Sequence, residues 1–278
     1  MKQSHLRALQ RVYLVLLFSF MYVPIAVMAV FSFNESKSRT VFTGFTFKWY
    51  KSLFHNEMIL SALGLSLVVA LIAAVVATVV GTAAAIGINA MGKRSQAVIN
   101  NISYMPVVNP EIITGVSLML LFVVVKDGFA WANQNLGWAL PENVFGLPTL
   151  LVAHISFCLP YVIFNVSPKL RQLDVRVYEA ALDLGCNPKQ AFFKVVLPEL
   201  APAILSAFLI CLTYSIDDFL ISYFTSGTTQ TLPIVIYSMT RKKVSPEINA
   251  LSTVMFLVIL AIILFYNYLD GRREARKA

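Results

Sequence analysis

The sequence is poor in charge. Only 13% of its 278 residues are Asp, Glu, Lys or Arg, whereas charged residues make up about a quarter of a typical soluble domain. Hydrophobic residues make up 58% of the chain, and the mean hydropathy is +0.73. So little polar surface excludes an ordinary soluble globular protein. The composition therefore places the chain in a lipid bilayer.

Cysteine is scarce as well, with three residues, Cys158, Cys186 and Cys211. Their odd number excludes a disulfide framework that pairs every thiol, and their spacing matches no metal-binding pattern. Two of the three fall in apolar stretches. We expect them to act as small apolar side chains in helix packing, with no metal bound.

The motifs of the common enzyme classes are also missing, since the sequence has no HExxH, GxSxG or GxGxxG pattern. Residues 87–94 come within one residue of a phosphate-binding P-loop pattern, the exception being Arg94 where Ser or Thr should hold magnesium. This segment also follows an apolar helix, whereas a P-loop joins a strand to a helix. We therefore expect no catalytic residue, no ATP hydrolysis and no cofactor in this chain.

Six apolar stretches are each long enough to cross about 30 Å of hydrocarbon, which takes about 20 helical residues. Six crossings put both termini on one side of the membrane. Lysine and arginine outside the stretches are more numerous on that side, which indicates the cytoplasm. Basic cytoplasmic loops beside anionic lipid also account for the net charge of +8 without a nucleic-acid partner. The sequence thus predicts an all-α membrane protein, one domain over residues 1–278, with spans at residues 12–31, 61–87, 99–125, 148–167, 203–224 and 248–269.

A polar segment, residues 169–202, separates the fourth and fifth expected spans on the cytoplasmic side. Good helix formers precede Gly185, which suits a helix C-cap. Asn187 suits an N-cap and Pro188 the first helical position, so a second helix is predicted there. We expect that helix to stop before Leu197. Two short helices joined at a glycine predict a compact knob that fits a groove on another protein.

The same segment contains Glu179-Ala180-Ala181, then three residues and Gly185, then nine residues and Val195-Val196-Leu197-Pro198. This pattern resembles the EAA loop of the permease subunits of ABC importers, with Val195 in place of isoleucine. The resemblance implies a type I ABC importer permease fold, whose coupling helix docks into a cleft of the nucleotide-binding subunit. It assigns Glu179, Ala180, Ala181 and Gly185 to that contact. The alternative is a structural helical hairpin at the membrane surface.

Four further segments, spread over most of the chain, resemble the C-type permease subunit of bacterial spermidine/putrescine importers. This resemblance implies a multi-pass protein of the bacterial inner membrane that works in a complex. Its implied partners are a second related permease, two copies of an ATPase that binds ATP and magnesium, and an extracytoplasmic polyamine-binding protein. The four segments are residues 45–50, 154–160, 215–219 and 245–251.

Three acidic residues, Glu111, Asp217 and Asp218, fall inside the expected spans. An ionisable group in a span costs about 2.5–3.5 kcal/mol on insertion scales, so it indicates a function by default. At helical rise all three lie at a similar depth, and no lysine or arginine is predicted inside the spans to neutralise them. With Tyr214 one turn before the aspartates, such a site suits a cationic alkylammonium substrate. The alternative is that the acids form hydrogen bonds within the helix bundle or face a partner permease.

Helix geometry and two prolines add detail to the expected substrate pathway. Neighbouring residues of a helix point about 100° apart, so we expect only one of Asp217 and Asp218 to face a translocation pathway. Pro106 and Pro110 should interrupt the third span, and non-helical backbone at that depth is tolerated where it lines a cavity or is buried in protein. His154 stands alone in an apolar span, where we expect a hydrogen-bonded histidine at a helix interface.

These observations predict a permease subunit of an ATP-driven importer, with polyamines as the expected substrate. Two alternatives remain open. One is an importer permease for another small solute, such as a different organic cation or a metal chelate. The other is a proton-coupled secondary transporter in which one of the three acids carries the proton. Dependence on a separate ATPase distinguishes these two classes of transporter.

Overall fold

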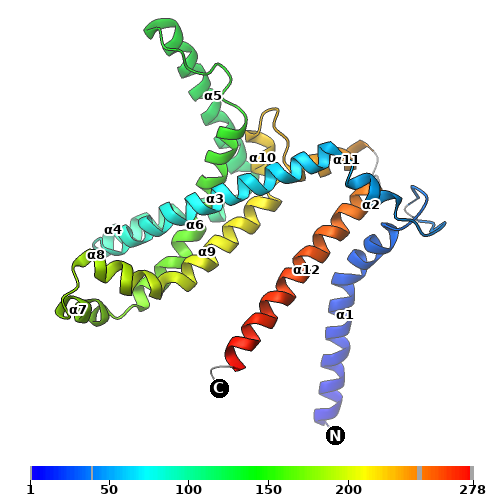
Figure 1. Cartoon of the computed structure of the whole chain (residues 1–278), viewed down its shortest axis with the longest axis horizontal. Helices are drawn as coiled ribbons and strands as arrows, with labels where there is room; N and C mark the ends of the chain where they lie inside the picture. Colours follow the sequence, from blue (N-terminus) through cyan, green and yellow to red (C-terminus); the bar gives the residue numbers. More distant parts are fainter. Residues whose placement is uncertain (1, 39, 243–245, 276–278) are drawn as a thin grey trace. The chain divides into compact units, whose positions relative to one another are not determined.

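The computed structural model describes residues 2–38, 40–242 and 246–275 (Figure 1). These residues are mainly helical, and the described part of the chain has one isolated antiparallel bridge, between Asn34 and Phe45. The chain divides into two compact units, with boundaries after Leu60 and after Val235. The first unit combines the two ends of the chain, and the second is its middle. The expectation of one functional domain over residues 1–278 stays a prediction.

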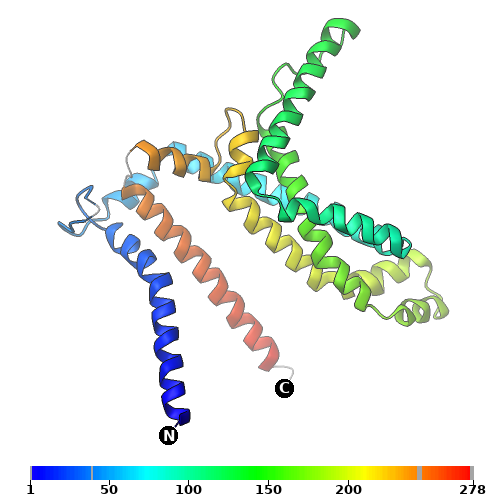
Figure 2. The ribbon, with the colours of Figure 1, turned by 180° about the vertical axis from the view of Figure 1, so that it is seen from behind.

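In the terminal unit, the two long terminal helices α1 and α12 contact each other, and the short helix α2 packs against α12. Figure 2 shows these helices from behind. Ser52 and Asn56, at the end of this short helix and just beyond it, both donate hydrogen bonds to the carboxylate of Glu247 in α12. The buried Trp49 indole donates to the Asn34 carbonyl over 2.7 Å. The helices are α1 (Lys2–Phe31), α2 (Lys48–Leu53) and α12 (Pro246–Ala275), with α11 (Leu232–Lys242) crossing the unit boundary.

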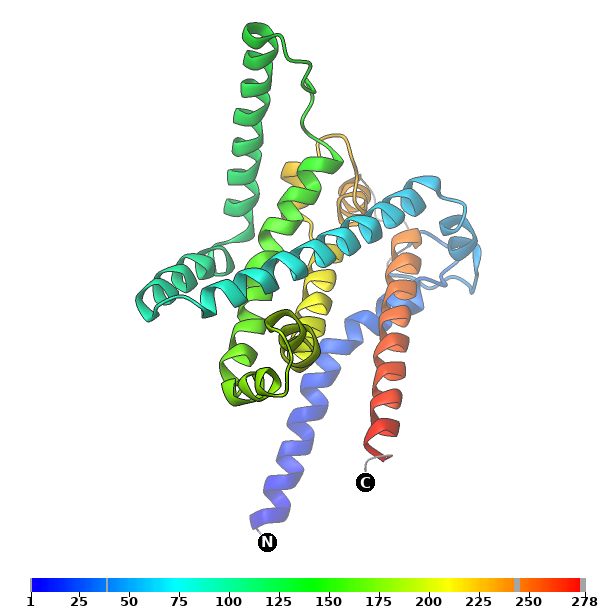
Figure 3. The same cartoon turned by 60° about the vertical axis from the view of Figure 1, so that its left-hand side comes forward.

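The middle unit is built around α6 and α9, which lie side by side (Figure 3). The helix α3 also crosses a unit boundary, since it begins before Leu60. The elements are α3 (Glu57–Asn89), α4 (Lys93–Val108), α5 (Glu111–Leu136), α6 (Leu147–Gln172), α7 (Val175–Asp183), α8 (Pro188–Ala191), a π-helical turn (Phe192–Val196), α9 (Leu197–Asp217) and α10 (Leu220–Thr225).

Small side chains form the core between α3, α6 and α9. Lipid tails are as apolar as leucine, so membrane helices gain stability from close van der Waals packing, which small residues permit. Gly81 marks the closest approach, because a Cβ atom there would lie 2.6 Å from the Cβ atom of Val162 on α6. Cys158 and Cys211 are buried and free in this core, in the packing role expected for them. The fully buried members are Ala74, Ala77, Ala85, Cys158, Val162, Val166, Ala207 and Cys211.

Five helices in the described part of the chain are long and apolar enough to cross a membrane, and Pro246–Ala261 is a shorter apolar helix within α12. They correspond to the six expected stretches, although the third and fifth differ in extent. Ser245, the first residue of the resembling segment 245–251, lies outside the described residues. The five are Leu9–Phe31, Glu57–Asn89, Glu111–Leu136, Leu147–Gln172 and Pro188–Asp217.

The third expected span, residues 99–125, is not one helix. The helix α4 ends at Val108, Asn109 is extended with ψ of 140°, and α5 begins at Glu111. Pro110 causes this break, as predicted, because it disfavours helical backbone at the preceding residue. Pro106 lies inside α4 without ending it. The predicted bounds were therefore wrong, and the helix long enough to cross the membrane starts at Glu111.

The fifth expected span, residues 203–224, is also divided. The helix α9 ends at Asp217, and Asp218 is extended, with ψ of 121°. After this break α10 begins at Leu220. No proline or glycine lies at the break, so the one local sequence signal for it is Asp218, a residue type that favours helix caps.

The helix that was expected to stop before Leu197 instead continues through it. The backbone N–H of Leu197 donates to the carbonyl of Phe192, five residues back, which is the register of a π-helix. This shift comes directly before Pro198, which has no N–H to donate and whose ring crowds the preceding turn. A single helical rod therefore runs from Pro188 to Asp217.

Candidate functional site

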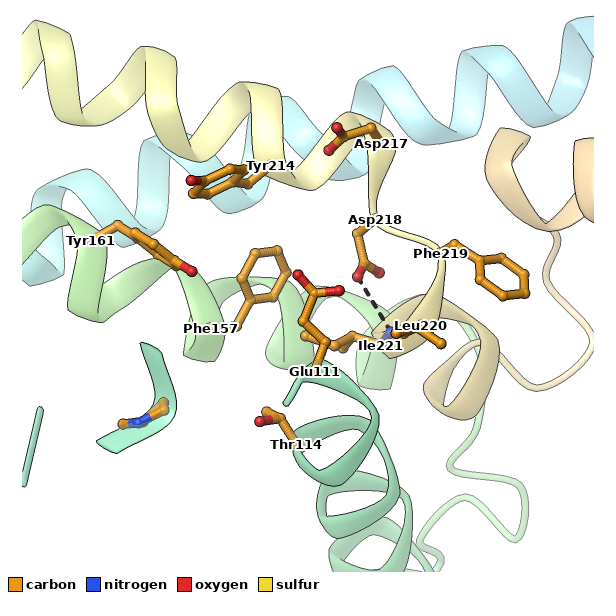
Figure 4. A pocket seen from close by; sticks show the side chains of 11 residues that line it. Glu111, Thr114, Phe157, Tyr161, Tyr214, Asp217, Asp218, Phe219, Leu220 and Ile221 are labelled. Carbon is orange, nitrogen blue, oxygen red and sulfur yellow. Dashed lines mark hydrogen bonds between the residues drawn. The ribbon is translucent and has the colours of Figure 1, made fainter. Parts of the chain in front are cut away.

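The two helix breaks of the middle unit lie at one cavity of about 460 Å³. The α4–α5 break brings Glu111 to this cavity, and the α9–α10 break brings Asp217 and Asp218. Figure 4 shows these side chains, with Phe157 and Tyr161 of α6, arranged around the same space. The remaining lining residues are Pro106, Thr114, Tyr214, Phe219, Leu220 and Ile221.

All four residues predicted from the sequence for the substrate pathway thus lie together: Glu111, Tyr214, Asp217 and Asp218. Both aspartates line this cavity, although they are neighbours in sequence. The 100° rule requires a continuous helix, and α9 ends at Asp217 while Asp218 is extended. Whether these residues bind a substrate stays a prediction.

Two of the carboxylates have no cationic partner among the residues that the structure describes. Within the described residues, no lysine or arginine lies within salt-bridge distance of Glu111 or Asp217, and both are exposed in this chain. Glu111 is the first residue of α5, where the helix dipole favours a negative charge. Asp217 is the last residue of α9, where the dipole favours a cation instead. The cavity is therefore electrostatically suited to a positively charged ligand.

Aromatic side chains line the same space. The rings of Tyr161 and Tyr214 meet edge to face, with 4.8 Å between their centroids. Aromatic faces beside carboxylates attract alkylammonium groups through cation–π interactions. Sequence reasoning did not include Phe157 and Tyr161, although they stand four residues apart on α6 and so share a face. Which face of α6 met the acids could not be known before the helices were placed.

Asp218 differs from the other two acids because it is buried, with 9% of its surface exposed. Its two oxygens accept hydrogen bonds from the backbone N–H groups of Ile221, at 3.3 Å, and Ser222, at 2.7 Å. It therefore caps the first turn of α10. The Nε2 atom of His154 lies 3.5 Å from Oδ2 of the same carboxylate.

His154 is a buried, hydrogen-bonded histidine at a helix interface, as predicted. Its Nδ1 atom lies 2.6 Å from the Ser215 hydroxyl of α9, and its Nε2 atom lies 3.0 Å from the Ser222 hydroxyl of α10. The imidazole therefore contacts a residue on each side of the α9–α10 break.

The polar segment 169–202 contains two helix caps. Gly185, with φ of +90°, donates to the carbonyl of Leu182, and Cys186 donates to the carbonyl of Ala181. These two bonds are the Schellman arrangement, in which a glycine with positive φ satisfies the last carbonyls of a helix. The predicted C-cap at Gly185 is confirmed.

The next helix begins as predicted at Asn187 and Pro188. The Asn187 side chain accepts from the backbone N–H of Gln190, and the Gln190 side chain accepts from the backbone N–H of Asn187. This reciprocal pair is a capping box. The turn between α7 and α8 is therefore specified at both ends by local hydrogen bonds.

The resulting knob, residues 175–191, carries the EAA-like residues at one end of the middle unit (Figure 1). Glu179, Ala180 and Gly185 are exposed, whereas Ala181 is buried. Leu184 is 86% exposed, which leaves a large apolar side chain beside the glycine turn. The knob thus presents small residues and one prominent leucine on its surface.

Comparison with known proteins identifies the family. Residues 77–277 match the family described as binding-protein-dependent transport system inner membrane component. The putrescine transport system permease protein PotI of Escherichia coli (strain K12) is 37% identical over 270 residues, which are 96% of this chain and 92% of that protein. The spermidine/putrescine transport system permease protein PotC of Haemophilus influenzae is 34% identical over 267 residues, 96% of this chain and 98% of that protein.

A solved structure has the same fold. It is a bacterial alginate ABC transporter in complex with an alginate pentasaccharide-bound periplasmic protein, with a TM-score of 0.73 over 98% of this chain and 95% of that chain. At 17% identity this likeness concerns the fold alone. The predicted all-α importer permease fold is confirmed. The chain belongs to the family of binding-protein-dependent transport system inner membrane components, the multi-pass permeases of ABC importers.

Proposed function

We propose that this protein is the permease subunit of an ATP-driven importer of polyamines, and that its cavity forms half of the path for the cation. One observation carries the substrate class: a cavity within the membrane helices holds two carboxylates without a cationic partner in the described part of the chain, and tyrosines stand beside them. The names of the putrescine and spermidine/putrescine permeases that resemble this chain support the same substrate.

The chemistry of the cavity fits a polyamine in two ways. A polyamine carries ammonium groups separated by short methylene chains, so it needs separate anionic sites with apolar or aromatic surface between them. Glu111 and Asp217 come from different helices and offer two such anions, while Tyr161 and Tyr214 offer the aromatic surface. The C-terminal dipole of α9 adds to the attraction at Asp217. We assign Asp218 to the structure of the helix break, because its oxygens already accept two backbone hydrogen bonds.

The complex that we propose contains a second related permease, two copies of an ATPase and an extracytoplasmic polyamine-binding protein. ATP and magnesium would bind to the ATPase copies. The family description supports a binding protein as partner, and so does the periplasmic protein bound to the alginate transporter. The lysine and arginine bias supports an arrangement with both termini and residues 169–202 in the cytoplasm.

We further propose that the knob docks into the ATPase through Glu179, Ala180, Ala181 and Gly185. Three of these residues are exposed, and the neighbouring Leu184 gives the contact an apolar anchor. From the knob one helical rod of 30 residues leads to Asp217. At about 1.5 Å per residue this rod is about 45 Å long. Movement of the knob would therefore reach the cavity through one continuous helical segment.

Neutral substitutions of the two unpaired acids test the cavity. The variants Asp217→Asn and Glu111→Gln keep the side-chain shape and remove the charge. The loss of a charged hydrogen-bond partner should lower the maximal rate of labelled putrescine uptake by roughly tenfold or more. Asp127→Asn is the matched control, because Asp127 is an exposed carboxylate on α5 that does not line the cavity. If both cavity variants assemble normally and transport like the parent, the cavity is not the cation path.

A further inference from the structure

A buried polar cluster, here called the break cluster, lies at the α9–α10 break. It consists of His154, Ser215, Asp218 and Ser222, whose exposed fractions are 1%, 3%, 9% and 0%. They come from α6, from the last turn of α9, from the break itself and from α10. Buried polar groups are stable when they are hydrogen-bonded, and a lost partner leaves the other group unsatisfied in apolar surroundings.

The contacts within the break cluster determine where the imidazole carries its proton. Oδ2 of Asp218 lies 3.5 Å from Nε2 of His154, so a proton on Nε2 makes this contact attractive, whereas a lone pair would make it repulsive. In the neutral imidazole Nδ1 is then the acceptor for the hydroxyl of Ser215, which lies 2.6 Å away. Nε2–H points to the hydroxyl of Ser222 at 3.0 Å. A neutral imidazole with one fixed tautomer thus joins the two sides of the break.

The break needs such support because its own sequence specifies it only weakly. Asp218 and Phe219 contain neither the ring of proline nor the freedom of glycine, so the one local signal for a break is the preference of aspartate for capping a helix start. The extended Asp218 backbone is held instead by contacts of its side chain with Ile221, Ser222 and His154. The direction of Asp217, the last residue of α9, depends on where this break occurs.

We propose that His154 is the positioning residue of the cavity: by bridging Ser215 and Ser222 beside Asp218, it fixes the helix break that presents Asp217 to the cation. The effect on transport rests on the proposed function, whereas the effect on the position of Asp217 does not. His154 does not line the cavity, so it acts through the break and does not itself contact the substrate.

A matched control separates this role from ordinary helix packing. Cys158 lies one turn after His154 on α6, is fully buried, and contacts the backbone carbonyl of Cys211 on α9. Cys158→Ala therefore removes buried volume from the same α6–α9 interface and leaves the break cluster intact. His154→Leu introduces an apolar side chain of similar size, which has neither of the two nitrogens. His154→Gln keeps a hydrogen-bond donor and an acceptor, so it is the conservative variant.

The experiment uses the whole complex, with Asp217→Cys introduced and Cys186→Ser removing the partly exposed native thiol. The rate of modification by a cationic methanethiosulfonate reagent then reports where position 217 points, and it requires no polyamine. Adding His154→Leu should lower this rate at least about fivefold, because two hydrogen bonds of the break are lost. Adding His154→Gln should keep the rate within about twofold, and adding Cys158→Ala should leave it unchanged.

Uptake is measured in parallel with Asp217 in place. We expect His154→Leu to lower the maximal uptake rate about tenfold and His154→Gln to restore most of it. A modification rate that His154→Leu leaves unchanged, or that Cys158→Ala lowers equally, overturns the inference. If His154→Leu does not assemble, Ser222→Ala takes its place, with an expected fall of about threefold in modification, and an unchanged rate again overturns the inference.

The two proposals fail separately. If the His154 variants alter modification at position 217 while Asp217→Asn transports normally, the positioning role of His154 stands and the proposed cation path is wrong. If Asp217→Asn abolishes uptake while the His154 variants alter neither modification nor uptake, the cation path stands and the positioning role is wrong.

Discussion

Gly185 offers a sharp test of the coupling loop, because its substitution changes the backbone and nothing else nearby. Gly185 has φ of +90°, and a Cβ atom added there would meet no heavy atom within 4 Å. The penalty for alanine is therefore that of a positive-φ backbone, about 1–2 kcal/mol. Such a difference changes the ratio of formed to unformed turn by a factor of roughly 5 to 30.

We expect the loss of coupling to be larger for residues that adopt positive φ less readily. We predict that Gly185→Ala lowers ATP-dependent putrescine uptake by up to about 5- to 30-fold, because the ratio of formed to unformed turn falls by that factor. Gly185→Asn should lie between glycine and alanine, since asparagine tolerates positive φ better than other side chains. The assay compares uptake, ATPase activity and the amount of ATPase that copurifies with the permease.

Gly92→Ala is the matched control for this series. Gly92 also has no heavy atom within 4 Å of an added Cβ, but its φ is −65°, which alanine adopts without strain. It should therefore transport like the parent. Equal activity of Gly185→Ala and the parent, or an equal loss in Gly92→Ala, would refute the link between this turn and coupling.

Two further predictions concern the stability of the middle unit. Gly81→Ala forces a Cβ against Val162 at 2.6 Å. The cost of this overpacking exceeds the gain in helix propensity, so the substitution should destabilise the unit by about 1 kcal/mol. Gly87→Ala has open space at its Cβ and should be neutral or stabilising, so the reverse order in unfolding measurements in detergent would contradict the packing. Asn187→Ala removes the capping box with Gln190 and should destabilise the turn by about 1 kcal/mol, whereas Asn187→Ser retains a cap. Limited proteolysis of residues 169–202 measures this difference, and equal cleavage of the two variants would argue against the cap.

Local signals in the sequence predicted those features that depend on neighbouring residues. The caps at Gly185 and Asn187 follow from turn chemistry within a few positions. The interruption at Pro110 follows from a covalent restriction on the residue before proline. The apolar stretches predicted the membrane helices because length and hydropathy are sufficient to identify such helices.

Features that depend on tertiary contacts were not predictable in the same way. The break at Asp218 combines a local cap by its own side chain with a contact to His154, which lies far away in sequence. The helix through Leu197 continues because a π-helical turn adjusts the register before Pro198, where a rule based on proline alone expected a stop. The contribution of Tyr161 to the cavity required knowledge of which face of α6 meets α9.

The central claim is that this permease serves an ATP-driven polyamine importer. The most direct measurement is uptake of labelled spermidine and putrescine by cells without their own polyamine transport. The cells express this chain with its partner subunits, with and without an inactivating substitution in the nucleotide site of the ATPase. The account predicts uptake that requires an active ATPase. Uptake that survives inactivation of the ATPase, or no uptake of either polyamine by an assembled complex, would contradict it.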